Sequence, residues 1–112
     1  MKRGEIWWAD LPPSRGSEPG FRRPVVIVSE NRFNDSALRT VIVVALTTNL
    51  GLGDLPGNVT VPAKGTGLTT ASVANVTQVT TVDRDDLDAR IGRVSGRVMD
   101  GISDGLRLVL AL

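Results

Sequence analysis

The 112-residue sequence predicts a mainly β (α+β) fold, a small and mainly antiparallel β-barrel with one C-terminal α-helix packed across it. Two observations predict this fold. Up to residue 94, short runs of β-branched and other apolar residues alternate with turns rich in Gly and Pro, which is typical of about five to seven short strands. From Ser95 onward, the apolar residues recur at helical spacing. The length suits one domain over residues 1–112 with a single core.

The N-terminal part predicts two strands separated by a long connection. Residues 6–11 (IWWADL) are rich in aromatic and apolar residues and end at Pro12-Pro13. Residues 12–22 contain several Pro, Gly and Ser residues, so we expect a long mobile loop there. Residues 25–28 (VVIV) are a continuous β-branched run, which predicts a strand buried on both faces.

The middle of the chain contains its most apolar stretch, residues 40–48 (TVIVVALTT), which we expect to be the central strand. Residues 31–36 before it have the composition of a turn or a short helical turn, and residues 49–57 after it are a second loop rich in glycine. A short strand is expected at residues 59–61, where Pro62 ends it.

The later strands are less regular in sequence. Residues 72–76 and 78–82 predict an interrupted β region. The segment DRDDLDAR that follows predicts a short helical turn, with Asp83 as the cap for the amides after it. We expect one more strand at residues 91–94.

Residues 95–112 predict an amphipathic helix. Its apolar face and its charged face are set by residues three or four apart. The apolar positions are Val98, Ile102, Leu106 and Val109, and the charged ones are Arg97, Asp100, Asp104 and Arg107. Gly101 and Gly105 lower the intrinsic helix propensity by about 1 kcal/mol each relative to Ala, so we expect the helix to depend on docking its apolar face.

The composition excludes several kinds of chemistry. With no cysteine, the chain has no disulfide and no thiolate chemistry, and it fits a reducing cytoplasm. With no histidine, it has no Ser-His-Asp triad, no histidine general base and no His-ligated zinc. No apolar run is long enough to span a membrane, and no signal sequence follows Met1.

Charge is unevenly spread although the net charge is only +1. Residues 1–39 carry seven Lys or Arg against five acidic residues, whereas residues 83–112 carry five Arg against six Asp. Such a distribution can concentrate positive potential at one site without making the whole chain a polyelectrolyte binder.

Arg22 and Arg23, directly before Pro24, are the first candidate site residues. Pro24 biases Arg23 toward an extended backbone, which fixes the direction of its side chain. A guanidinium offers forked donors and a permanent charge, which suits a phosphate. The alternative is structural, with one arginine paired to Glu18 or Asp10 and the other solvated.

Further candidates surround the same strands. Thr47 and Thr48 end the predicted central strand, where a hydroxyl and a guanidinium could meet one phosphate, although threonine is common in strands for packing reasons. Ser17 and Glu18 lie in the first long loop, and loops on rigid scaffolds often carry function. Gln78 lies between threonines, where its amide could read a base edge or face solvent.

Trp7 and Trp8 alternate across the first predicted strand, so we expect one in the core and the other more exposed. The exposed one could stack a nucleobase or lie under the C-terminal helix. Two further segments carry no motif. GLGDLPG lacks the Lys-Ser or Lys-Thr of a phosphate-binding loop, and DRDDLD lacks the glycine and terminal Glu of a calcium loop.

Five segments follow one another along the chain: KRGEIWWADL, GSEPGFRRPVVIVS, TVIVVALTTN, PGNVTVPA and SVANVTQVTTVD. In this order they resemble the MazF/PemK toxins of bacterial toxin-antitoxin systems, especially the actinobacterial branch. The likeness runs from Lys2 to Leu112, and its most specific parts are RPVVIV and ALTT.

The resemblance implies an SH3-like barrel of the MazF/CcdB/Kid type, a homodimer, and inhibition by a cognate MazE-like antitoxin with a disordered acidic tail. It implies an endoribonuclease that cuts single-stranded RNA at a short sequence without a metal or other cofactor. The RNA's own 2′-OH is the nucleophile, and the products carry a 2′,3′-cyclic phosphate and a 5′-OH.

Carried over by residue, the resemblance implies that Arg23 contacts the scissile phosphate and supports proton transfer, and that the Thr47 hydroxyl helps to hold the phosphate. We favour charge stabilisation for Arg23, because a guanidinium stays protonated near neutral pH. Ser17 and Glu18 match a loop that covers the RNA channel, and Gln78 matches a glutamine near the base-reading pocket. Arg22 and Thr48 are expected to bind RNA beside them.

Three positions depart from the family pattern. Many relatives have an acidic residue before that glutamine and a basic residue two positions after it, where this chain has Thr77 and Thr80. Most have another residue in place of Pro19. Since these positions lie near the bases, the departures concern the sequence that is cut more than cleavage itself.

Two other functions remain open at this point. CcdB-type toxins share the implied barrel but poison DNA gyrase by protein contact, so the fold alone cannot separate the two activities. A metal-dependent nuclease using Asp10, Glu5 or Glu18 is a third possibility, although no paired-carboxylate spacing supports it.

Overall fold

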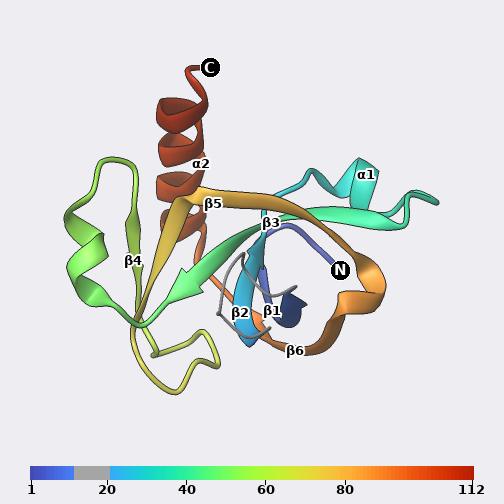
Figure 1. The fold of residues 1–112 in the computed structure, drawn as a ribbon, viewed down its shortest axis with the longest axis horizontal. Helices are drawn as coiled ribbons and strands as arrows, with labels where there is room; N and C mark the ends of the chain where they lie inside the picture. Colours follow the sequence, from blue (N-terminus) through green and yellow to red (C-terminus); the bar gives the residue numbers. More distant parts are fainter. Residues whose placement is uncertain (12–20) are drawn as a thin grey trace.

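The computed structural model describes residues 1–11 and 21–112. Within these residues, six antiparallel strands form one sheet in the order β4-β5-β3-β2-β1-β6. The strands are β1 (Glu5–Leu11), β2 (Phe21–Ile27), β3 (Thr40–Thr47), β4 (Val59–Val61), β5 (Ser72–Asp83) and β6 (Leu87–Arg93). The sheet curls on itself, and the C-terminal helix α2 (Gly96–Leu110) stands beside β4 and β5 (Figure 1). The predicted mainly β fold with a C-terminal helix is confirmed.

The start of β2 differs from the prediction. The strand begins at Phe21 instead of Val25, so Arg22 and Arg23 belong to the strand and not to the loop before it. The reason is pairing with β1, where Arg22 lies opposite Asp10 and Arg23 opposite Ala9. Local sequence cannot show this, because residues 12–20 separate the partner strand β1 from β2 in the sequence.

The later β region also differs from the prediction. β5 is one strand of 12 residues, and the expected interruption is a shift in its register with β3 between Val44 and Leu46. The predicted helical turn is a short 3₁₀ helix η2 (Arg84–Asp86), where the Asp83 carboxylate accepts a bond from the amide of Asp85 at 2.9 Å, as expected. β6 then starts at Leu87, earlier than the predicted residue 91, because it pairs with β1.

Two short helices occupy segments that the sequence assigns to turns or loops. The helix α1 (Asn31–Asn34) is a single turn, as allowed for residues 31–36. The glycine-rich loop contains a second 3₁₀ helix, η1 (Leu50–Asp54), whose first amides are capped by the side chain of Asn49.

The core consists of two clusters on opposite sides of β2 and β3. Alternate residues of these strands point to opposite faces, so Val26 and Val44 join one cluster while Val25 and Val43 join the other. The first cluster is Ile6, Val26, Val28, Val44, Leu46, Val61, Ala74, Val94 and Ile102. The second cluster is Ala9, Val25, Ile27, Val41, Val43, Val82 and Leu87. The prediction that residues 25–28 are buried on both faces is therefore confirmed.

Helix α2 docks through Val98, Ile102 and Leu106, as the sequence predicts, whereas Val109 of the predicted apolar face is exposed. Ile102 is fully buried in the first cluster, and the Ser95 hydroxyl caps the helix by accepting a bond from the amide of Val98 at 3.2 Å. Gly105 lies against Gly57, and a Cβ on Gly105 would overlap the Gly57 carbonyl oxygen. Close packing thus explains a glycine that weakens the helix by itself. No helix in the described part of the chain is long and apolar enough to cross a membrane.

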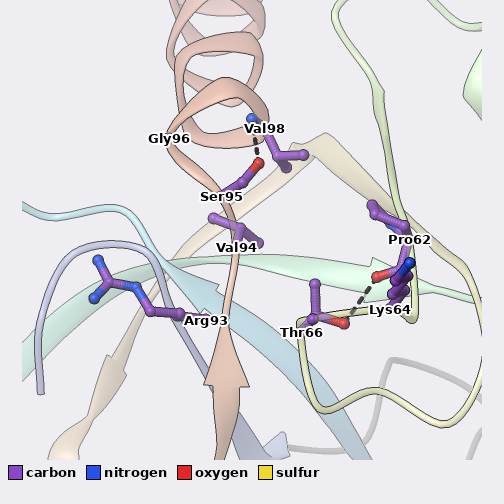
Figure 2. Close-up of a pocket in the computed structure, with 9 residues that line it drawn as sticks. Pro62, Lys64, Thr66, Arg93, Val94, Ser95, Gly96 and Val98 are labelled. Carbon is purple, nitrogen blue, oxygen red and sulfur yellow. Dashed lines mark hydrogen bonds between the residues drawn. The ribbon is translucent and has the colours of Figure 1, made fainter.

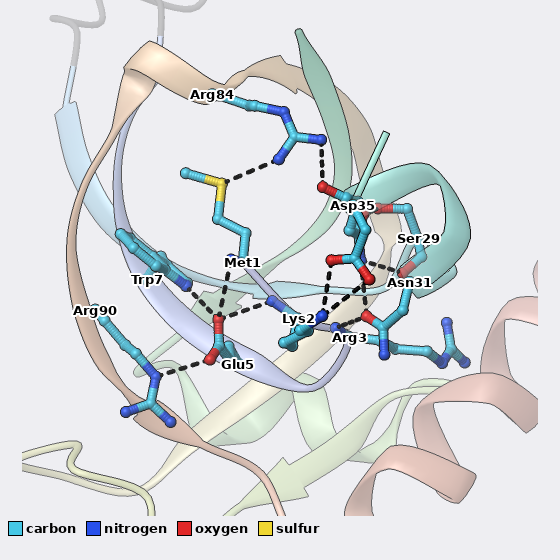
Figure 3. Close-up of polar contacts among 11 residues, drawn as sticks. Met1, Lys2, Arg3, Glu5, Trp7, Ser29, Asn31, Asp35, Arg84 and Arg90 are labelled. Carbon is cyan, nitrogen blue, oxygen red and sulfur yellow. Dashed lines mark hydrogen bonds and ion pairs between the residues drawn. The ribbon is translucent and has the colours of Figure 1, made fainter. Parts of the chain in front are cut away.

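Polar contacts tie the N-terminus to β1 and β6 (Figure 3). The Glu5 carboxylate accepts bonds from the amide of Lys2 at 2.8 Å, the indole N–H of Trp7 at 3.1 Å and Nε of Arg90 at 3.0 Å. Burial by itself raises the pKa of Glu5, but these hydrogen bonds and the nearby positive charges outweigh it and hold the pKa below its usual value. Glu5 is therefore an ionised link between β1 and β6.

Candidate functional site

The candidate residues Arg23 and Thr47 lie at the same end of the antiparallel pair β2–β3. The paired register ends at Val25–Ala45, and each candidate lies two residues beyond it. Residues two apart in a strand share a face, and so do residues paired across strands. Arg23 and Thr47 therefore belong to one face of neighbouring strands, the face that carries the second core cluster.

Thr47 is held firmly while its hydroxyl keeps a free donor. The residue is half-buried and pairs with Val73 of β5. Its Oγ1 accepts a bond from the amide of Asn49 at 3.2 Å. This contact uses a lone pair of the oxygen, so the hydroxyl hydrogen can still be donated to a ligand.

Arg23 is also half-buried and starts from a strand paired to β1. Its cross-strand neighbour is Ala9, a small side chain with no exposed surface, and the next pair is Trp8 with Pro24. The backbone of Arg23 is thus set by a strand partner on one side and by Pro24 in sequence. The extended backbone predicted for Arg23 is therefore confirmed, and a strand carries this guanidinium.

Arg22 points to the opposite face and is engaged there. Its guanidinium lies over the Trp8 indole, 4.5 Å from the ring centroid. It also donates to both carboxylate oxygens of Asp88, from Nε and Nη2, at 3.0 Å each. These hydrogen bonds raise the pKa of Arg22 and lower the pKa of Asp88. The predicted structural pairing of one arginine therefore occurs with Asp88 of β6, which sequence reasoning did not identify.

Thr48 lies beside a cavity of about 220 Å³, which we call the Trp8 cavity. It is lined by Trp8, Pro24, Thr48, residues 67–70, Ser72 and Ile91. Trp8 and Pro24 are paired across β1 and β2, and Thr48 follows the end of β3, so three neighbouring strands form one wall. Residue spacing does not predict this cavity, because its lining comes from five separate segments.

Trp7 and Trp8 lie in different environments. Trp7 packs against the second core cluster, which confirms one core tryptophan. Trp8 is half-buried between Arg22 and the Trp8 cavity, whereas α2 packs on β4 and β5. The expectation that it could lie under the C-terminal helix is therefore wrong.

Gln78 is exposed on β5, close to the shift in register with β3. Thr80 of β5 lies opposite Val43 of β3, and Gln78 is two residues further along the same strand. Val79 pairs with Val44 and Ala74 pairs with Leu46, so the regular alternation of β5 is interrupted around Gln78 and the strand register does not assign it to the face of Arg23 and Thr47. Ser17 and Glu18 lie outside the described residues.

A second cavity, of about 320 Å³, lies between the turn after β4 and the start of α2 (Figure 2). Its lining includes Lys64, Thr66, Arg93 and Ser95. The Thr66 hydroxyl contacts the carbonyl oxygens of Pro62 and Ala63, and Ser95 caps the helix, so both hydroxyls have structural roles. The charged ends of Lys64 and Arg93 do not converge in Figure 2.

The carboxylates of the metal-nuclease alternative do not form a metal site in the described part of the chain. Glu5 is engaged by Lys2, Trp7 and Arg90, and Asp10 is exposed on β1. No group of three or more His, Cys, Asp or Glu residues with suitable geometry occurs among residues 1–11 and 21–112.

Comparison with known proteins gives consistent matches over the whole chain. Residues 2–110 match the family model described as a PemK-like, MazF-like toxin of type II toxin-antitoxin system. The chain is 45% identical over 112 residues to endoribonuclease MazF6 of Mycobacterium tuberculosis, covering 100% of this chain and 98% of that protein. It is 36% identical over 115 residues to endoribonuclease EndoA of Bacillus subtilis, covering 100% and 96%.

A solved structure of an endoribonuclease in complex with its cognate antitoxin, from a mycobacterial species, has the same fold. It superposes with a TM-score of 0.77 at 27% identity, covering 100% of this chain and 96% of that one. The family match includes all the candidate positions, from Ser17 to Gln78.

Proposed function

The chain belongs to the PemK-like, MazF-like toxin family of type II toxin-antitoxin systems and is an endoribonuclease, and on this premise we propose that it cuts single-stranded RNA at a phosphate that Arg23 and Thr47 contact. The observation that carries the proposal is the position of these residues beyond the last β2–β3 pair, on one face of two rigid strands. The matched relatives are endoribonucleases, which favours RNA cleavage over the gyrase-binding alternative.

The reaction needs no protein nucleophile. The 2′-oxygen of the RNA attacks the adjacent phosphorus and loses its proton, while the bond from phosphorus to the 5′-oxygen breaks and that oxygen gains a proton. The products are a 2′,3′-cyclic phosphate and a 5′-OH. This route suits a chain without histidine or cysteine, because the substrate supplies the attacking group.

Arg23 and Thr47 act on the charge that develops at phosphorus. Negative charge grows on the non-bridging oxygens as the fifth bond forms, and preorganised donors stabilise this state more than the ground state. The guanidinium of Arg23 supplies forked, charged donors, and the Thr47 hydroxyl supplies one more. Because both come from strands, little reorganisation is needed when the RNA binds.

The remaining candidates bind the RNA on either side of the cut. Gln78 is exposed beside the register shift of β5, and its amide contacts a base edge. Arg22 leaves Asp88 and binds a phosphate instead. Thr48 contacts the RNA beside Thr47. Ser17 and Glu18 contact the RNA from the loop before β2, a role that rests on family likeness alone.

The protein works as a homodimer inhibited by a cognate antitoxin. Exposed apolar side chains occur at the end of α2 and directly after it (Leu108, Val109, Leu110 and Leu112), and in or directly after η1 (Leu50 and Leu55). An exposed apolar surface of this kind marks an interface. A mycobacterial relative is solved with its antitoxin, and an acidic antitoxin segment can occupy the RNA site and pair with Arg23. We place the protein in the cytoplasm, where its RNA substrate is.

One experiment tests the proposed function directly. The purified protein is incubated with a long defined RNA in EDTA, and the 5′ ends of the fragments are mapped and tested for a hydroxyl group. Cutting at discrete sites with 5′-OH ends supports the proposal, and no cutting rejects it. A parallel gyrase supercoiling assay is the control for the CcdB-like activity, since inhibition there without RNA cutting supports that alternative.

A further inference from the structure

The Trp8 cavity takes no part in the cleavage chemistry described above, yet two of its lining residues directly follow Arg23 and Thr47 in sequence. Pro24 follows Arg23, and Thr48 follows Thr47. Successive side chains of a strand point to opposite faces, and successive Cα atoms are 3.8 Å apart. Since Pro24 and Thr48 directly follow Arg23 and Thr47 in sequence, an RNA strand that crosses the ends of β2 and β3 there passes beside the Trp8 cavity.

The lining of the Trp8 cavity suits a neutral heterocycle better than a phosphate. Among residues 1–11 and 21–112, no charged side chain lines it. Its apolar part comes from Trp8, Leu68 and Ile91, and its polar part includes the hydroxyls of Thr48 and Thr70. A hydroxyl both donates and accepts hydrogen bonds, which matches the mixed donors and acceptors on a base edge.

The size of the Trp8 cavity also fits one base. Its volume is about 220 Å³, below the roughly 300–1,000 Å³ of pockets that hold drug-sized ligands. A single planar ring system can enter such a space, whereas a base pair or a folded peptide segment cannot.

The Trp8 cavity is preorganised on two sides. Trp8 lies in a strand paired to both neighbours, opposite Pro24 and Ala89, and the Arg22 guanidinium fixed by Asp88 lies over its indole. The loop that forms the other wall is pinned to β6, because a Cβ on Gly92 would overlap the carbonyl oxygen of Thr66. A ligand that enters pays little entropy to order these groups.

We propose that the Trp8 cavity binds one unpaired nucleobase next to the scissile phosphate, with Trp8 as its aromatic wall and the hydroxyls of Thr48 and Thr70 at the base edge. The subsite rests on the proposed function, since it acts on the same RNA. It makes Trp8 and Thr48 specificity-determining residues for one position of the cut sequence, on the face of the sheet away from Arg23 and Thr47.

The test compares abasic RNA substrates in the wild type and in Trp8→Leu. A short RNA containing a mapped cut site is made as a series, each member lacking the base of one nucleotide near the cut. At one position, the wild type loses about tenfold in kcat/KM, as expected when a base loses an aromatic contact. Trp8→Leu has a lower kcat/KM than the wild type on the intact RNA. Removing the base at that same position lowers the kcat/KM of Trp8→Leu by less than about twofold, and removing any other base lowers it by the same factor as in the wild type.

The outcomes separate the subsite from the proposed function. Equal abasic penalties in the wild type and Trp8→Leu at every position overturn the subsite while leaving RNA cleavage intact, and assign the cavity to another ligand such as an antitoxin side chain. A wild type that cuts none of the intact RNAs rejects cleavage itself, and the subsite with it.

A second variant keeps the test decisive if Trp8→Leu does not fold, which circular dichroism reports. Thr48→Val removes the hydroxyl and keeps the shape of an exposed side chain. On an RNA pool randomised around the cut, Thr48→Val changes the preferred base at one position. The control Thr81→Val, an exposed strand threonine outside the Trp8 cavity, leaves the preference unchanged. An unchanged preference in Thr48→Val overturns the proposal.

Discussion

At the residue scale, neighbouring arginines of one strand have different environments because strand residues alternate between faces. Arg22 is held by Asp88 and the Trp8 ring on one face, whereas Arg23 belongs to the face of Thr47. Sequence spacing treats the pair as equivalent. The two substitutions should therefore have different effects, and each tests one role.

Arg23→Ala should lower RNA cleavage by more than about 100-fold, because it removes a charged donor to the developing phosphorane. The fold should persist, since Arg23 belongs to neither core cluster and its cross-strand neighbour Ala9 stays packed. Single-turnover cleavage measures the effect, and circular dichroism checks folding. Arg22→Ala is the matched control and should cost much less. Cleavage by Arg23→Ala at the wild-type rate would show that the assigned site is wrong.

Asp88→Asn should strengthen RNA binding, because it releases Arg22 to contact a phosphate. One more phosphate contact makes the salt dependence of the binding constant steeper by roughly 0.7 in the log–log slope for a single strand. Binding is measured on an RNA with a 2′-deoxy nucleotide at the cut site, which cannot be cleaved. Asp85→Asn, which removes the exposed partner of Arg39, is the control. An unchanged slope in Asp88→Asn would mean that Arg22 does not reach the RNA.

At the element scale, strand pairing sets the boundaries that local composition missed. β2 extends back to Phe21, and β6 starts at Leu87, because both pair with β1. Close backbone contacts set the position of α2 in the same way, where Gly105 meets Gly57. Polar contacts of Glu5 then link β1 to β6.

Gly105→Ala should destabilise the protein by about 1–3 kcal/mol although alanine is the better helix former, because overpacking costs more than the gain of about 1 kcal/mol in propensity. The added Cβ would overlap the Gly57 carbonyl and lie 3.1 Å from a methyl group of Val76. Urea unfolding measures the change. Gly96→Ala, with nothing within 4 Å of its added Cβ, should be neutral or stabilising. Equal effects of the two substitutions would contradict the packing argument.

Glu5 should make stability depend on pH in the acid range. Its pKa is lower in the folded protein than in the unfolded chain, so its ionised form contributes stability above the unfolded pKa. That contribution is lost as the pH falls through the folded pKa. Thermal unfolding from pH 7 to pH 3 should show a smaller fall in Tm for Glu5→Gln than for the wild type, although Glu5→Gln is less stable at pH 7. Parallel pH profiles would exclude this role.

At the scale of the whole molecule, the exposed apolar residues of α2 and η1 lie on a surface that a single chain leaves open. Leu108 is 62% exposed and Leu112 is 86% exposed. A second copy of the chain would remove such side chains from water, which is the main driving force for association. The proposed dimer therefore uses a surface distinct from the Trp8 cavity.

Leu108→Lys should shift the protein from dimer to monomer, because it places a charge in the proposed interface. Sedimentation velocity at several concentrations measures the change. Leu38→Lys is the control, since Leu38 is 51% exposed and lies before β3, outside α2 and η1. If the dimer persists in Leu108→Lys but not in Leu38→Lys, the interface is formed by the surface around Leu38 instead.

The amino-acid sequence alone predicts the fold class, the docked helix and the chemistry that remains open to the chain. Local patterns carry this information, since the β-branched run VVIV favours a strand buried on both faces and the apolar spacing after Ser95 indicates a helix face. The family likeness singled out Arg23 and Thr47, and the absence of histidine and cysteine pointed to a site of another kind.

The tertiary structure decided which of these residues share a face and which are occupied. Asp88 is 66 residues from Arg22, and the Trp8 cavity combines segments from Trp8 to Ile91. Such contacts depend on the register between strands, and register is fixed by burial and pairing of the whole sheet. For that reason, the partner of Arg22 and the Trp8 cavity could not be predicted from residue spacing.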